Sequence, residues 1–425
     1  MKKNNAITIT ITLIAILLTY FYSVTTPLSV PIYAQQDLQL VKSKNLQIEL
    51  DDNLTTNAQL TFPAVGQGPY PGILLISGSG ANDMNETAGF IRINETTGEK
   101  DYPPVTLFQI AQYLSERGFA VLRYDKRGVG ENHTILDTNV WGNVTIDDLK
   151  HDAGKALDVL MQQPEVNNKI TIIGHSEGTT LAPRVAIDNP DKVDNIVLMG
   201  TMAQNVTDLL HFQTVELPVQ YAEEVLDKNG NGSLSLQEAS QDLVFERLIG
   251  GNLSVILTQN LPNGTSLLNP EYNLNNDTSI NIERELRPAL EQNAKSFFAS
   301  SKPGTGSIEE GKCTNLEGCD AYEKSFFAFE PNLRTIGKVP PSTGVLLLNG
   351  ENDTQVPVQQ ALLLQQRLTE VKHPDHTLIT YPNLGHDFSP SSQWFTEVGP
   401  IPEYVLQDIF SWLSDSARAK GHLME

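Results

Sequence analysis

The chain is long, of ordinary composition and strongly acidic. Its 425 residues are 40% hydrophobic and 19% charged, so they can bury a large core and exceed the length of one simple domain. The formal net charge is −22, which argues against nucleic acid binding and against electrostatic docking to anionic lipid, because both need a basic surface. We therefore expect no nucleic acid partner.

Residues 1–34 have the pattern of an export segment. Two lysines at positions 2 and 3 precede an apolar stretch over 6–22, and Ala34 offers a small residue before a cut at Gln35. Signal peptidases prefer a small residue such as alanine at the third position before the cut, and this chain has Ile32 there. An uncleaved membrane anchor therefore stays open as an alternative. We expect contact with a membrane only through this segment.

Two further features agree with a secreted or cell-surface protein. Cys313 and Cys319, the only two cysteines, lie in a Gly-rich stretch and are predicted to form a small local disulfide loop. No other Cys and no nearby His completes a metal-ligand set with them. N-x-S/T glycosylation sequences occur at Asn53, Asn85, Asn94, Asn132, Asn143, Asn205, Asn231, Asn252, Asn263, Asn276 and Asn352.

Apolar runs alternate with helical spacings along much of the chain. A lead-in hairpin is predicted over 46–50 and 58–62, and buried strands are predicted at 72–76, 120–124, 170–173, 195–200, 344–350 and 377–381. Helices are predicted at 104–118, 146–163, 179–189 and 402–419. This alternation predicts an α/β fold with a mostly parallel sheet and helices on both faces.

The alternation stops after residue 200 and resumes near 341. The stretch between is too long for a connection and too well patterned for disorder, so it is predicted to be an inserted, mainly helical cap with one helix over 277–299. The predicted domains are the export segment or anchor (1–34), a first part of the core (35–200), the cap (201–340) and a second part of the core (341–425).

A serine lies where the run 170–173 passes into a predicted helix. The residues are Gly174-His175-Ser176-Glu177-Gly178, the G-x-S-x-G pattern of the nucleophile elbow of α/β-hydrolases. In that turn the serine hydroxyl stands above the carboxyl edge of the sheet, at a helix N-terminus that favours developing negative charge. Ser176 is therefore the candidate nucleophile.

A serine hydroxyl needs a base to remove its proton, and the base needs a third group to orient it. Asp353 follows the strand that ends at Gly350, and His386 follows the last strand. Serine, acid and histidine thus occur in the chain order of α/β-hydrolases. Of the two rival acids, Glu351 is too close to the strand end and Asp387 is adjacent to His386, so Asp353 is predicted to orient the base.

An oxyanion hole needs two preorganised N–H donors. One is predicted to be the amide of Glu177, directly after the nucleophile. The other is predicted to be the amide of Ser79, in the glycine-rich loop that follows the strand 72–76.

Together these stretches resemble the esterase and lysophospholipase-like branch of the α/β-hydrolase superfamily. Its members carry G-S-G followed by D, then R-Y-D-K-R-G-x-G and G-H-S-E-G, and the resemblance covers residues 46–199 and 344–419. It implies the α/β-hydrolase fold and a triad of Ser176, Asp353 and His386. It also implies that Arg123, Asp125 and Arg127 build a structural turn.

The same resemblance implies a serine hydrolase of the carboxylesterase class that takes a small-molecule ester and needs no cofactor for catalysis. Met84-Asn85 departs from the branch, which usually has arginine and a second acid there. The G-G-P-G oxyanion loop usual in prolyl peptidases is absent, which favours an esterase over a peptidase.

A second motif lies in the insertion. Residues 227–238 fit an EF-hand calcium loop, with a glycine at position 6 and an apolar anchor, Leu234, at position 8. One flanking helix is predicted through Leu226 and the other through 239–248; no second EF-hand loop is visible, so a structural calcium ion rather than a switch is expected. The predicted ligands are Asp227, Asn229, Asn231, Ser233, Ser235 and Glu238.

Two other functions stay open at this point. One is a serine aminopeptidase-like amide hydrolase, which would use the same three residues. The other is a non-catalytic, calcium-dependent surface binding protein on a hydrolase scaffold.

Overall fold

The computed structural model describes most of the chain after residue 39. The export segment predicted at 1–34 and the two cysteines lie outside the described residues, so these predictions stay predictions. The described residues are 40–87, 92–93, 100–101, 105–235, 238–239, 241–249, 258–260, 266–268, 273–275, 277–300, 320–395, 397 and 399–419.

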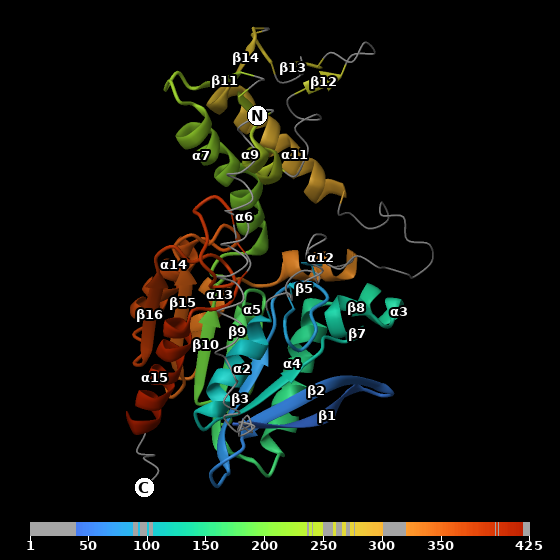
Figure 1. The fold of residues 1–425 in the computed structure, drawn as a ribbon, viewed down its shortest axis with the longest axis vertical. Helices are drawn as coiled ribbons and strands as arrows, with labels where there is room; N and C mark the ends of the chain where they lie inside the picture. The colour runs from blue at the N-terminus through green and yellow to red at the C-terminus, as the bar shows by residue number, and fades with distance from the viewer. Residues whose placement is uncertain are drawn as a thin grey trace, which may run out of the picture. The chain divides into compact units, whose positions relative to one another are not determined.

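One eight-stranded sheet organises the fold, in the order β1-β2-β6-β3-β9-β10-β15-β16 (Figure 1). The strands β1 and β2 form an antiparallel hairpin, β2 is antiparallel to β6, and every further neighbour pair is parallel. The bounds are β1 Val41–Asp51, β2 Leu54–Pro63, β3 Tyr70–Ile76, β6 Ala120–Tyr124, β9 Val166–His175, β10 Asn195–Met199, β15 Gly344–Gly350 and β16 His376–Tyr381. The predicted hairpin and all six predicted strands are confirmed.

Helices cover both faces of this sheet (Figure 1). Successive side chains of a strand point to opposite faces, and accordingly Leu74 and Ile76 of β3 join one hydrophobic cluster while Ile73 and Leu75 join the other. A strand buried on both faces is therefore apolar throughout. The first cluster includes residues of α4 (Ile146–Met161), α5 (Gly178–Asp188) and α14 (Val358–Glu370); the second includes residues of α2 (Thr106–Glu116) and α15 (Glu403–Ala419).

The four predicted core helices are confirmed to within a few residues at each end. The start of α4 could be predicted from the sequence because Thr145 caps the helix and Asp148 completes a capping box. Smaller described elements of the core are β4 Arg92–Ile93, β5 Lys100–Asp101, β7 Val129–Gly130, η1 Glu131–His133, β8 Thr134–Ile135, α3 Thr138–Gly142, α13 Asn332–Thr335 and η5 Ile336–Lys338.

The segment between β10 and β15 carries a third hydrophobic cluster, which includes Val219, Leu234, Phe245, Ile280 and Leu286. Its described elements are α6 Val206–His211, η2 Phe212–Glu216, α7 Leu217–Tyr221, η3 Ala222–Leu226, β11 Ser233–Ser235, α9 Leu243–Leu248, β12 Thr258–Asn260, β13 Ser266–Leu268, β14 Ser279–Asn281, η4 Ile282–Leu286, α11 Arg287–Ser300 and α12 Asp320–Ala328.

Two predictions for this segment are wrong in detail. The helix predicted over 277–299 begins only at Ile282, because β14 pairs with β11. The helix predicted through 239–248 is interrupted at Asp242, whose carboxylate instead caps a new helix, α9, by accepting the amides of Val244 and Phe245. An aspartate competes with the helical backbone in this way and favours a helix start.

Among the described residues, no helix combines the length and the apolar character needed to cross a membrane.

Candidate active site

Ser176 occupies a sharp turn between β9 and α5. Its φ is +52°, a left-handed conformation that non-glycine residues rarely adopt. The flanking glycines permit the turn: a Cβ on Gly174 would lie 2.2 Å from the carbonyl oxygen of Gly178, and one on Gly178 would lie 2.4 Å from that of Ile76. The amide of Ser176 donates to the carbonyl of Met199 (2.8 Å), so the turn is held against the end of β10.

Asp353 and His386 meet at the same edge of the sheet. The Nδ1 of His386 lies 2.8 Å from the Oδ2 of Asp353, and both side chains are buried. The other oxygen, Oδ1, accepts the amides of Gln355 (2.9 Å) and Val356 (2.8 Å). The carboxylate is therefore fixed by its own loop while it faces the imidazole, the arrangement that orients a histidine base.

The rival acid Glu351 is directed elsewhere. It is exposed and accepts a hydrogen bond from the hydroxyl of Thr380 (2.8 Å).

His386 is packed against the elbow. A Cβ on Gly200, directly after β10, would lie 3.1 Å from its Cε1, so the glycine lets the ring approach the sheet edge. The ring centroids of His386 and His175 are 5.0 Å apart. His175 is the residue before Ser176, so the histidine, its aspartate and the serine converge at the ends of β9, β10, β15 and β16.

A buried ion pair, not predicted from the sequence, lies beneath this group. His175 Nδ1 lies 2.9 Å from Glu86 Oε1 and His175 Nε2 lies 3.1 Å from the carbonyl oxygen of His386. Burial alone would lower the pKa of His175, but the attraction and hydrogen bond of Glu86 outweigh it and raise that pKa to about 9. Burial would raise the pKa of Glu86, yet His175, the Gly78 amide and Lys126 lower it overall.

The predicted oxyanion donors lie on two loops that face each other. A Cβ on Gly78 would lie 3.1 Å from the Cβ of Ser176, which brings the loop after β3 against the elbow. The amide of Gly78 donates to Glu86 (2.5 Å). Among the described residues no group accepts from the amides of Ser79 or Glu177, so both have free donors.

The side chain of Glu177 links these loops to the insertion. Its carboxylate accepts from Lys126 Nζ (2.8 Å) and from the hydroxyl of Tyr322 in α12. Lys126 Nζ also donates to the carbonyl of Gly78 (2.5 Å). The two loops with the predicted oxyanion donors are thus joined through one buried ammonium group.

The turn after β6 holds the loop after β3. Asp125 accepts the amide of Met84 (2.7 Å) and the Nδ2 of Asn57 (3.1 Å), and Arg123 donates to Asn85. Arg127 pairs with the buried Asp152 through two hydrogen bonds (2.5 and 2.8 Å). These contacts are structural, as the resemblance implies for Arg123, Asp125 and Arg127.

Two protein-family models match this chain, and each matches a different part of the site. The model described as "Serine aminopeptidase, S33" matches residues 105–234, which contain Ser176. The model described as "Prolyl oligopeptidase family" matches residues 314–418, which contain Asp353 and His386. Neither match reaches half of the chain. Ser176 follows β9, the fifth strand in the sheet order. The chain has the α/β-hydrolase fold.

One relative of this α/β-hydrolase-fold chain is Esterase EstD from Thermotoga maritima. The two are 30% identical over 167 residues, which is 38% of this chain and 35% of that esterase. The chain thus matches about a third of the length of the relative.

Similar solved structures include a proline iminopeptidase from Mycobacterium smegmatis, with 13% identity, 89% of this chain and 100% of that chain covered, and a TM-score of 0.48. A thermophilic esterase from Thermogutta terrifontis has 15% identity, 88% and 99% coverage, and a TM-score of 0.45. Est1E from Butyrivibrio proteoclasticus has 12% identity, 88% and 99% coverage, and a TM-score of 0.41. At these identities and TM-scores the three structures carry no argument about this chain.

A cavity of about 500 Å³ lies beside Asp353 in the hydrolase fold. The loop after β15 lines one side of it and α6, η2 and α7 of the insertion line another. Its lining is rich in carboxylates, among them Asp208, Glu216, Glu224 and Glu351. Of these, Glu216 is paired with Arg287 (2.9 Å).

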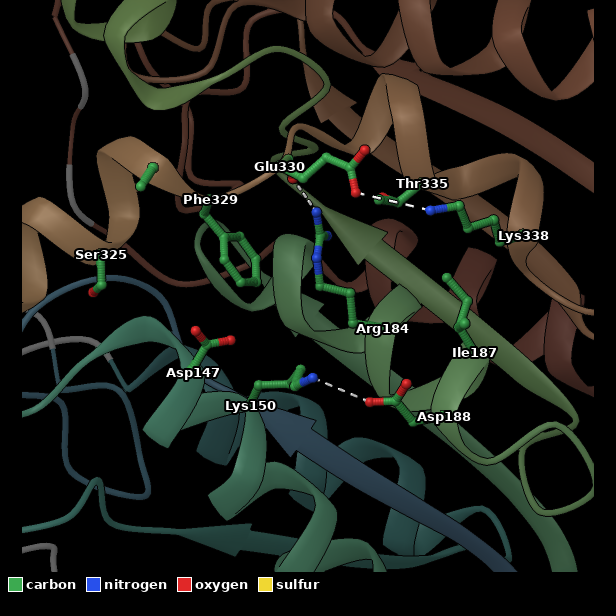
Figure 2. A pocket seen from close by; sticks show the side chains of 11 residues that line it. Asp147, Lys150, Arg184, Ile187, Asp188, Ser325, Phe329, Glu330, Thr335 and Lys338 are labelled. Carbon is green, nitrogen blue, oxygen red and sulfur yellow. Dashed lines mark hydrogen bonds and ion pairs between the residues drawn. The ribbon is translucent and has the colours of Figure 1, made fainter.

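A second cavity, of about 370 Å³, lies between α4, α5 and the residues after α12 (Figure 2). Most of its charged side chains have partners of their own. Arg184 donates to Asn332 (2.6 Å) and to the carbonyl of Glu330 while its guanidinium lies 4.3 Å from the ring centroid of Phe329, and Lys150 pairs with Asp188 (3.2 Å). We interpret these contacts as a structural attachment of the last part of the insertion to α4 and α5, and not as a binding site.

The predicted calcium loop has the chemistry of an oxygen site. Gly232, at position 6, has a φ of +73°, the sharp turn that this position requires. Asp227 accepts the amides of Asn231 (3.0 Å) and Gly232 (2.7 Å), and Glu238 accepts that of Ser235 (2.8 Å). The six predicted ligands offer two carboxylates, two amide oxygens and two hydroxyls, a hard donor set that fits calcium. No three His, Cys, Asp or Glu side chains cluster as metal ligands in the described part of the chain.

Sequence reasoning missed three residues next to the elbow: Glu86, Lys126 and Tyr322. Lys126 is part of the R-Y-D-K-R-G motif, so its place in that motif could have indicated a role near the site. Glu86 and Tyr322 contact the elbow from 89 and 145 residues away along the chain, and nothing near them in the sequence marks that contact.

Proposed function

We propose that the protein is a serine hydrolase that cleaves carboxylic esters through an acyl-enzyme intermediate. The observation that carries the proposal is the 2.8 Å contact of His386 with Asp353 beside a serine held at φ +52°. The 30% identity to a named esterase supports the ester as substrate class.

In the proposed reaction the Ser176 oxygen attacks the ester carbonyl carbon and His386 takes its proton. The amides of Ser79 and Glu177 stabilise the oxyanion, and the C–O bond to the alcohol breaks as His386 returns the proton to the leaving oxygen. Water then attacks the acyl-enzyme with the same base, which releases the acid and restores Ser176.

A fluorophosphonate probe tests the nucleophile. We expect the wild type to be labelled at Ser176 and the Ser176→Ala variant to remain unlabelled, because the probe reacts only with an activated serine. Ser43→Ala, on the exposed side of β1, is the matched control and should label like the wild type. Equal labelling of wild type and Ser176→Ala would contradict the proposal, and no labelling of either folded protein would favour a non-catalytic binding protein.

A second candidate is an aminopeptidase-like amide hydrolase with the same three residues. The carboxylate-rich cavity beside Asp353 favours it, because carboxylates recognise the ammonium group of a peptide N-terminus. The S33 serine aminopeptidase match over 105–234 agrees. The two candidates are distinguished by measuring kcat/KM for an aryl ester and for an anilide of the same amino acid. The esterase proposal requires a ratio of ester to anilide kcat/KM that is far larger than the ratio of their uncatalysed hydrolysis rates.

We further propose that the loop 227–238 binds a structural calcium ion and that the protein is exported. Binding to the folded form alone stabilises by roughly 2.7 kcal/mol at a hundredfold excess over Kd. Chelation should therefore lower the melting temperature measured by scanning calorimetry, while Ser176 still reacts with a small fluorophosphonate. Glu238→Ala should lower it equally in the presence of calcium. If chelator and variant both leave the melting temperature unchanged, the loop is only a turn.

A further inference from the structure

A second loop lies beside the loop 227–238 and has the same layout. Residues 273–285 reach it through β14, which pairs antiparallel with β11 so that Leu234 is directly opposite Ile280. Both side chains are buried in the third hydrophobic cluster. Leu234 is position 8 of the first loop, so Ile280 marks position 8 of the second and Asn273 becomes its position 1.

The two loops share their internal hydrogen bonds at equivalent positions. In the first loop, position 3 accepts the amide of position 5 (Asn229 from Asn231, 3.0 Å) and position 5 accepts that of position 7. In the second, Asn275 accepts the amide of Asp277 (3.2 Å) and Asp277 accepts that of Ser279 (2.7 Å). The described residues of the two loops therefore share these two turns.

Within the described part of the chain, the side chain of Asn273 has a buried oxygen without a hydrogen-bond partner, and this feature points to a bound cation. It is 6% exposed, and its Nδ2 donates to the carbonyl of Asp277 (2.8 Å), which places its carboxamide inside the loop. Its other atom, Oδ1, is buried and has no hydrogen-bond partner among the described residues. A buried acceptor without a partner is costly, and a cation in the loop would supply the missing partner.

A carboxylate reaches the second loop in spite of an irregular spacing. If the second loop is counted as twelve residues from Asn273, its last position is Arg284, where the first loop has Glu238. The following turn η4 is π-helical, however, and a π-helical turn contains one residue more than an α-helical turn. Glu285, 4% exposed, consequently folds back and accepts the amides of Leu274 (2.7 Å) and Asn281 (2.8 Å). Its carboxylate thus connects the start and the end of the loop, as a ligand from the exit helix must.

We propose that residues 273–285 form a second divalent-cation site, so that the insertion binds two calcium ions as a coupled pair. The ligands are oxygens of Asn273, Asn275, Asp277 and Glu285. Neutral amides and two carboxylates suit calcium, which accepts flexible oxygen coordination, more than magnesium, which demands near-ideal octahedral geometry. Because β11 joins the loops, ordering of one by its ion orders the strand of the other, which couples the two sites.

Isothermal titration of the chelator-treated full-length protein with calcium chloride tests this inference. We expect two ions for each chain, and one ion for Glu285→Gln and for Asn273→Ala. Glu238→Gln should also leave one ion, since it removes the carboxylate of the other loop. Glu291→Gln, at a partly exposed position of α11 where the carboxylate lies 3.9 Å from Lys295, is the charge-matched control and should keep two ions.

Asn273→Asp gives a test that does not depend on a disruptive change. An added carboxylate at position 1 should tighten one of the two Kd values, because affinity follows the ligand charge, and circular dichroism should show an unchanged fold. One ion in the wild type overturns the second site while it leaves the first intact. Two ions in both Glu285→Gln and Asn273→Ala, or an unchanged pair of Kd values in Asn273→Asp, also overturns it.

Discussion

Replacing Asp353 by asparagine should lower kcat about ten-thousandfold while the protein stays folded. The Oδ1 of Asp353 accepts the amides of Gln355 and Val356, and Oδ2 faces His386. An asparagine will turn its carbonyl oxygen toward the two amides and its NH₂ group toward the imidazole. His386 must then present an unprotonated Nδ1 to that NH₂, so its Nε2 carries the proton and cannot accept one from Ser176.

The measurement is kcat with an aryl acetate, together with circular dichroism to establish the fold. Glu351→Gln is the control, because Glu351 is exposed and, among the described residues, its side chain accepts a hydrogen bond only from Thr380; its kcat should stay within about twofold of the wild type. An Asp353→Asn variant that retains a tenth of the wild-type kcat would show that another group orients His386. Asp387 would be the first to examine, since it is adjacent to His386.

Replacing His175 by glutamine should lower the free energy of unfolding by about 3 kcal/mol near pH 6, because it leaves Glu86 as a buried carboxylate without its ion partner. The pKa of His175 is raised to about 9, so the pair stabilises the fold fully below the unfolded value near 6.5 and loses that contribution as the pH rises through 9. The pKa of Glu86 is lowered, so the contribution is also lost as the pH falls below its ordinary value near 4.5.

Urea unfolding of wild type and His175→Gln at pH 6, 8 and 10 measures this effect. The difference between the two proteins should be largest at pH 6 and should shrink above pH 9. His151→Gln is the control: His151 lies 3.6 Å from Asp51, but both side chains are about half exposed, so it should change stability by less than about 0.5 kcal/mol at every pH. A difference for His175→Gln that is constant from pH 6 to 10 would show that the pair is not charged.

The centre of the sheet was predictable because the strands β3, β10 and β15 consist mostly of buried apolar residues, and a strand buried on both faces can be recognised from such a run alone. The positions of Asp353 and His386 followed from the ends of β15 and β16. The acid was chosen from three carboxylates by its spacing from Gly350, and in the structure it is Asp353 that contacts the imidazole. What could not be predicted is the His175–Glu86 pair, because only the tertiary fold brings residues 89 positions apart together.

The second loop of the insertion escaped prediction for a different reason. Its position 6 is Thr278 rather than glycine, its position 12 is Arg284, and a π-helical turn brings Glu285 into place. A motif counts residues along the chain, whereas a ligand set depends on where side chains lie. The pairing of β11 with β14 aligns Leu234 with Ile280, and this alignment of the two loops cannot be read from the sequence.

The contact of Tyr322 with Glu177 limits how this enzyme scaffold can be recombined. Tyr322 reaches the residue after the elbow serine, and Asn332 donates to the carbonyls of Thr179 (2.9 Å) and Met202 (2.7 Å). Residues 320–332 therefore support the elbow, although in the chain they belong to the last part of the insertion (201–340). A chimaera that exchanges the insertion for one from another hydrolase needs its downstream junction before Asp320, because a later junction removes a support of the oxyanion loops along with the exchanged domain.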